Sequence, residues 1–111
     1  MTNSLNISYS EIKSPLSIIL SGRLDTMTAP PLEKIITELP EEITDLIFDM
    51  TDLEYMSSSG LRILLTTSKL MSSRAGTFTL MNVGETVREV LEITGFLDFI
   101  TVKENNIHET E

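Results

Sequence analysis

Apolar and polar residues alternate at the start of the chain, and short apolar runs follow. Leu5, Ile7 and Tyr9 are separated by polar residues, which is the period-2 pattern of a strand with one buried face. The run LSIIL at 16–20 is more uniformly apolar and contains β-branched residues. We therefore expect the two segments to pair as an antiparallel hairpin whose second strand is more central and ends at residues 21–22.

Three later segments carry apolar residues at helical spacing. The stripes are Leu32, Ile35, Ile36 and Leu39; Leu61, Leu64, Leu65, Ser68 and Met71; and Val87, Val90 and Leu91. The first follows Pro30-Pro31, which suits a helix start because the missing N–H donors are unpaired there anyway. The second is expected to end at Gly76, and the third to begin with a capping box from Asn82 to Glu85 and to end at Gly95.

Short strands at 46–48, 77–80 and 99–102 separate and follow these helices. The resulting order, β-β-α-β-α-β-α-β, predicts an α/β fold with a mixed sheet, an antiparallel N-terminal hairpin and parallel inner strands packed with helices. The helices should cover mainly one face or be divided unevenly between the two. We expect one domain over residues 1–111, with a frayed acidic tail at 104–111.

An acidic connector and three serines link the strand at 46–48 to the second helix. Asp49, Asp52 and Glu54 are expected in a solvated loop, and we favour this over a Mg²⁺ site because the whole chain is acidic. The serines at 57–59 then lie at a helix start, where hydroxyl oxygens can accept from unpaired backbone N–H groups. They either cap the helix or present a hydroxyl for modification, since a phosphate there would meet the positive end of the helix dipole.

Charge and composition exclude several classes of function. Eight Lys and Arg against seventeen Asp and Glu give a net charge of −9, which disfavours binding to nucleic acid. There is no cysteine, so disulfides and thiolate metal sites are excluded. The chain shows neither a leader pattern nor an apolar run of membrane-spanning length, and we expect a cytoplasmic protein without membrane insertion.

Catalytic motifs are missing as well. The single histidine, His108, lies in the expected tail, so no serine has an evident base. Phosphate-binding loops, dinucleotide-binding glycines and H-E-x-x-H are absent. We expect a protein that is not an enzyme and that binds no metal and no cofactor.

Two motifs resemble those of a known family. The pattern S-G-R-L-D-x-x-T-A-P-x-L-E from Ser21 to Glu33, followed by LIFDMTDLEYMSSSGLRILL from Leu46 to Leu65, is similar to the anti-sigma-factor antagonists, the stand-alone members of the STAS domain family. The resemblance implies a partner that is both an anti-sigma factor and an ATP-dependent serine kinase. It also implies that binding frees the sigma factor, that phosphorylation ends binding, and that a PP2C-type phosphatase reverses this.

The resemblance also implies a modification site. The family pattern is D-S-x-G-L, in which the serine accepts the phosphate. Ser57 takes the aspartate position, Ser58 the acceptor position and Ser59 the intervening one. Phosphorylation is therefore expected at Ser58, with Ser57 and Ser59 as alternatives because the neighbouring carboxylate is missing.

A partner surface is expected around this site. Asp25 matches an acidic residue that lies near the acceptor in the family, although capping of its own loop is an equally good interpretation. Met56 and Arg62 are expected to be exposed contacts. The predicted partner-binding residues are Asp25, Met56, Ser57, Ser59, Gly60 and Arg62.

Two other functions remain open at the level of sequence. One is a STAS-type accessory subunit that is not switched by phosphate, such as the cytoplasmic subunit of a lipid-transport ATPase, and Ser57 in place of aspartate favours it. The other is a nucleotide-binding module, for which the sequence offers no phosphate loop.

Overall fold

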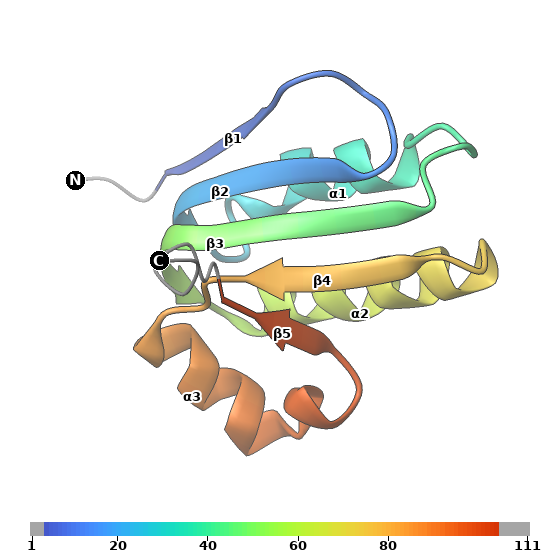
Figure 1. Cartoon of the computed structure of the whole chain (residues 1–111). Coiled ribbons are helices and arrows are strands. Elements are labelled where there is room, and N and C mark those ends of the chain that lie inside the picture. The colour runs from blue at the N-terminus through green and yellow to red at the C-terminus, as the bar shows by residue number, and fades with distance from the viewer. Residues whose placement is uncertain (1–3, 105–111) are drawn as a thin grey trace, which may run out of the picture.

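The described residues, 4–104, run through strands and helices in the order that the sequence predicts (Figure 1). In this computed structural model the elements are β1 Leu5–Tyr9, β2 Leu16–Leu24, α1 Ala29–Thr37, β3 Asp45–Met56, α2 Ser58–Ser73, β4 Thr77–Met81, α3 Glu85–Thr94, the short 3-10 helix η1 Phe96–Asp98, and β5 Thr101–Lys103. The predicted mixed α/β fold is confirmed, and η1 is the one addition among the described residues.

The strands form one sheet in the order β1-β2-β3-β4-β5. β1 is antiparallel to β2, and the remaining neighbours are parallel. From β2 to β5, each new parallel strand is added on the same side of the one before it. The helical connections between such strands are right-handed, so α1, α2 and α3 lie on one face of the sheet. Figure 1 looks onto the other face, with α1 and α2 behind the strands. The helices therefore cover one face of the sheet, which settles the choice between the two arrangements that the sequence left open.

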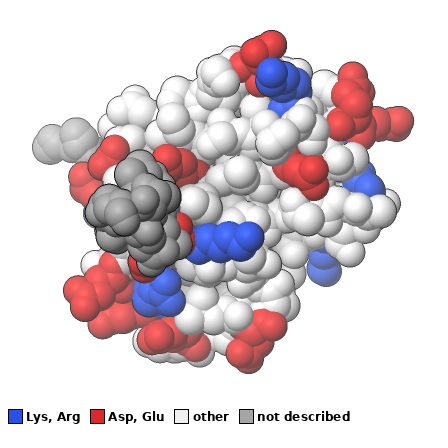
Figure 2. Space-filling view, viewed as in Figure 1, with Lys and Arg blue, Asp and Glu red and all other residues white. Residues whose placement is uncertain are grey.

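Burial along the strands agrees with this one-sided cover. Leu16, Ile18 and Leu20 of β2 are at most 1% exposed, whereas Ser17 and Ile19 between them face solvent. In Figure 2 most of the uncovered face is uncharged, with a basic side chain near its centre and acidic residues mainly toward its rim. The hydrophobic core therefore lies between the sheet and the helices.

β2 and β3 both extend further than predicted, so the expected acidic loop is wrong. The register explains why: Ile19 pairs with Asp49, but Ser21 pairs with Asp52, so β3 contains an extra residue, and a second irregularity follows. Such bulges break the alternation of buried and exposed side chains by which a strand is recognised in sequence. β3 consequently delivers Met56, and not a flexible loop, to the start of α2.

The buried face of α2 is rotated from the predicted one. Its buried residues are Ser59, Gly60, Ile63, Leu64, Thr67 and Met71, whereas the predicted Leu61, Leu65 and Ser68 are only half-buried. A Cβ at Gly60 would lie 3.0 Å from Leu24 and 2.5 Å from the Cγ of Met56. The missing side chain lets the first turn approach the ends of β2 and β3, and this sets which residues of α2 face the sheet.

The predicted capping box of α3 is wrong. The N-cap is Gly84, and Glu85 is already the first helical residue. Asn82 instead has a positive φ of 59° and donates from Nδ2 to the Oγ1 of Thr51 at 3.1 Å. The predicted stop at Gly95 is confirmed, because this residue adopts the left-handed conformation with φ 82°.

Two further boundaries differ from the predicted ones. α2 ends at Ser73, before Gly76, and the left-handed residue there is Ala75 with φ 57°. η1 occupies part of the segment that was expected to lead into the last strand, so β5 begins later than the predicted 99–102. Glu104 is exposed, and the rest of the expected tail lies outside the described residues.

Candidate functional site

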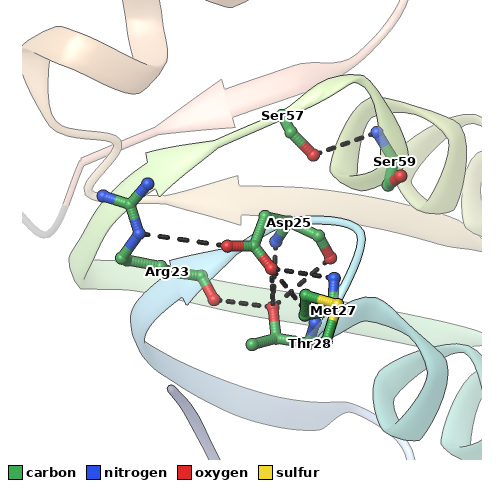
Figure 3. Close-up of polar contacts among 6 residues, drawn as sticks. All are labelled: Arg23, Asp25, Met27, Thr28, Ser57 and Ser59. Atoms are coloured by element: carbon green, nitrogen blue, oxygen red, sulfur yellow. Dashed lines mark hydrogen bonds and ion pairs between the residues drawn. The ribbon is translucent and has the colours of Figure 1, made fainter. Parts of the chain in front are cut away.

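The three serines lie where β3 passes into α2, at the left-hand edge of the sheet in Figure 1. Ser57 is the N-cap, with extended backbone angles, and its Oγ accepts a hydrogen bond from the backbone N of Ser59 at 3.2 Å (Figure 3). Its own backbone N donates to the carbonyl oxygen of Leu24 at 2.9 Å. The capping interpretation is therefore confirmed for Ser57.

The three hydroxyls differ in what surrounds them. Ser59 is 7% exposed, and its Oγ lies 2.9 Å from the Oγ1 of Thr26. Ser57 is half-buried, and its oxygen is engaged in the cap. Ser58 is exposed at the first position of α2, and within the described part of the chain its hydroxyl has no hydrogen-bond partner. Of the three, Ser58 is the most accessible to an enzyme.

Asp25 organises the loop between β2 and α1. Its Oδ1 accepts from the backbone N of Met27 at 3.0 Å and of Thr28 at 3.1 Å, and its own N donates to the Oγ1 of Thr28 at 2.9 Å. The Thr28 hydroxyl in turn donates to the carbonyl oxygen of Arg23 at 2.8 Å (Figure 3). The structure thus shows the loop-capping role of Asp25, and a role in partner contact stays a prediction.

A cation stacked on an aromatic ring flanks this loop. The guanidinium of Arg23 lies 4.2 Å from the ring centroid of Tyr55, its register partner on β3. The Nε of Arg23 is 3.9 Å from Oδ2 of Asp25, and it has no hydrogen-bond partner among the described residues. Arg23 and Tyr55 therefore join the ends of β2 and β3 on the side away from the core.

The Asp25 loop, residues 25–28, and the start of α2 form one continuous surface. The Thr26–Ser59 hydroxyl contact and the bond from Ser57 to Leu24 join them. Met27 is 82% exposed on this loop. Sequence reasoning did not single out Met27, although a methionine within a polar segment between a strand and a helix was the available signal.

The structure places the other predicted contact residues differently. The expected exposure of Met56 is wrong: it is 2% exposed, because β3 continues to this residue and directs its side chain under Gly60 of α2. Gly60 is buried as well, whereas Arg62 is exposed as expected. Of these three, only Arg62 is available to a partner in this conformation.

Thr26, Met27 and Ser58 of this site face solvent. A hollow of about 510 Å³ lies further along α2, against Phe99, and none of its lining residues belongs to the Asp25 loop or to the three serines. Within residues 4–104 no cluster of three His, Asp or Glu side chains is placed to hold a metal ion. The same residues contain no helix that is both long and apolar enough to cross a membrane.

Two known proteins with similar sequences carry the same name. An anti-sigma-B factor antagonist of Bacillus subtilis is 28% identical over 98 residues, covering 88% of this chain and 90% of that protein. The same name is carried by a Staphylococcus aureus protein that is 28% identical over 101 residues, covering 90% of this chain and 94% of the relative.

The fold and the family model agree with these relatives. A crystal structure of an anti-sigma factor antagonist from Mycobacterium paratuberculosis matches with a TM-score of 0.81 at 24% identity, covering 93% of this chain and 88% of that one. The family model of the STAS domain matches residues 6–111. The chain, which has the five-stranded sheet and one-sided helices described above, therefore belongs to the STAS domain family.

Proposed function

We propose that this protein is an anti-sigma factor antagonist that acts by partner switching in the cytoplasm. In its unphosphorylated form it binds an anti-sigma factor that is also an ATP-dependent serine kinase, and so frees the sigma factor. Phosphorylation of Ser58 ends this binding, and a PP2C-type phosphatase restores it. The names of the sequence relatives support the class of function. The role is regulatory and not catalytic.

The observation that carries the proposal is the contrast among the three serines. Among these three serines, only Ser58 has a hydroxyl that is both solvent-exposed and without a hydrogen bond to the described residues, so a kinase can reach it without breaking a contact. Ser57 and Ser59 would each lose a hydrogen bond that joins α2 to its own start or to the Asp25 loop. Ser58 is therefore the proposed acceptor.

A phosphate on Ser58 should release the partner and leave the fold intact. Phosphoserine carries roughly −1.5 to −2 charges, and its repulsion of one partner carboxylate at about 6 Å is on the order of 5 kcal/mol before salt screening. A tenfold loss of affinity needs only about 1.4 kcal/mol. Within the domain the phosphate meets the positive end of the α2 dipole, which favours it by roughly 0.3 to 2 kcal/mol.

Serine in place of aspartate at position 57 is compatible with this switch. The Oγ of Ser57 already makes the capping bond to the N of Ser59 that an aspartate would make. The substitution thus keeps the start of α2 in place while removing one negative charge beside Ser58. For this reason we prefer the switched protein to an unswitched accessory subunit of a complex such as a lipid-transport ATPase.

Incubation with ATP and a kinase-type anti-sigma factor from the same organism tests the proposal. We expect one phosphate, mapped by mass spectrometry to Ser58, and none in Ser58→Ala. Ser57→Ala and Ser59→Ala serve as matched controls that should still be labelled. A phosphate on Ser57 or Ser59 in the wild-type protein would contradict the assignment of the site, and the absence of any phosphate would contradict the switch.

A further inference from the structure

The side chain of Met27 is exposed to solvent on a loop that contains many internal hydrogen bonds. It is 82% exposed, yet its backbone N donates to Oδ1 of Asp25 at 3.0 Å. The residues on either side are fixed as well, Thr26 by the hydroxyl of Ser59 and Thr28 by the carbonyl oxygen of Arg23. When a partner covers a side chain on a backbone that is already ordered, little backbone conformational entropy is lost.

Exposure alone does not distinguish Met27, because single apolar residues are common on protein surfaces. Ile93 on α3 is 85% exposed and makes the comparison direct. Met27 and Ile93 differ in their position relative to Ser58. The Thr26–Ser59 contact at 2.9 Å places the residue before Met27 against the residue after Ser58, so a partner that covers Ser58 also reaches this loop.

We propose that Met27 is an apolar anchor of the partner interface, and that it enters a hydrophobic pocket on the kinase-type anti-sigma factor. The Thr26–Ser59 contact acts as a positioning element that holds this anchor at a fixed place relative to Ser58. Methionine is enriched in interface cores, and its unbranched, polarisable side chain adapts to irregular pockets. The inference rests on the proposed function and adds to it a residue whose apolar side chain is buried against the partner.

The anchor also explains how a phosphate at Ser58 weakens binding beyond simple repulsion. Burying Met27 requires water to leave the adjoining surface, which includes the first turn of α2. A phosphate in that turn must either stay hydrated or be buried with its charge, and burying an unpaired charge is strongly unfavourable. The pocket therefore cannot close over Met27 and phospho-Ser58 together.

Titration of the purified anti-sigma factor with four variants tests the anchor. Met27→Ala should raise the dissociation constant about tenfold or more, whereas Ile93→Ala should stay within about twofold of wild type. Thr26→Val, which replaces the hydroxyl with a methyl group, should weaken binding by about threefold or more. Ser58→Asp places a negative charge at the proposed phosphorylation site and so tests the switch. Met27→Ala, Ile93→Ala and Ser58→Asp should melt within about 3 °C of wild type, and Thr26→Val within about 8 °C because the Ser59 hydroxyl loses its partner; all four stay folded in the titration, so that loss of binding is not loss of the fold.

The outcomes separate the inference from the proposed function. If Ser58→Asp loses binding while Met27→Ala binds within about twofold of wild type, the anchor is overturned and the switch stands. Equal losses in Met27→Ala and Ile93→Ala also overturn the anchor. If the wild-type protein does not bind the anti-sigma factor, both are overturned.

Discussion

Thr26 and Ser59 lie 33 positions apart in the chain, and their hydroxyl oxygens are 2.9 Å apart in the structure. The first belongs to the Asp25 loop and the second to the first turn of α2, and both segments follow neighbouring parallel strands. Parallel strands that lie side by side bring the segments at their carboxyl ends together, which is the usual place for function in such sheets. The proposed partner surface is a product of this topology.

The N-cap at Ser57 predicts a measurable contribution to stability. Ser57→Ala removes the acceptor for the backbone N of Ser59 and should lower the free energy of unfolding by about 1 kcal/mol. Ser57→Asp restores an acceptor, adds a charge at the positive end of the helix dipole and recreates the aspartate of the family pattern, so it should be at least as stable as wild type. Urea denaturation measures both. An alanine variant as stable as the wild-type protein would contradict the capping role.

The two interpretations of Asp25 can be separated by a pair of variants. Asp25→Ala removes the oxygen that accepts from the backbone N of Met27 and of Thr28, and it should cost about 1 to 2 kcal/mol of stability. Asp25→Asn keeps an acceptor oxygen and loses the charge, so we expect near-normal stability, and partner binding stays near normal only if loop capping is the whole role of Asp25. Chemical denaturation and titration with the anti-sigma factor measure the two properties. Normal folding with weakened binding in Asp25→Asn would show that the carboxylate contacts the partner.

Two glycines that look alike in the sequence should respond differently to the same change. A Cβ at Gly76 would clash with the carbonyl oxygen of Thr44, and this backbone atom cannot move aside easily. Gly76→Ala should therefore cost about 3 kcal/mol or more, or prevent folding. Gly84→Ala has open space around the new methyl group and should cost about 1 kcal/mol or less. Thermal melting compares them, and equal losses would contradict the close approach at Gly76.

Much of the fold was predictable because most elements keep a regular pattern of burial. β1, β4 and α1 lie where the apolar spacing placed them, and the order of elements fixed the topology. The prediction failed where the period is interrupted. The bulges in β3 interrupt the alternation of buried and exposed residues, so the second half of this strand was not predicted. Met56 was therefore assigned to a loop, although its side chain is buried.

The candidate site was predictable only in part. The serines at a helix start and the capping capacity of Asp25 are local properties, so the sequence revealed them. The contact between Thr26 and Ser59 is not local, because it depends on the register of β2 against β3. The exposure of Met27 follows from how the Asp25 loop folds on itself, which spacing alone does not encode.

The affinity of the anti-sigma factor for the protein before and after phosphorylation of Ser58 tests the central claim most directly. Isothermal titration calorimetry on the two forms, with equal folding checked by thermal melting, makes this measurement. The account predicts tight binding by the unmodified protein and a loss of about tenfold or more in the phosphorylated form, without loss of the fold. Equal affinity of the two folded forms would contradict it.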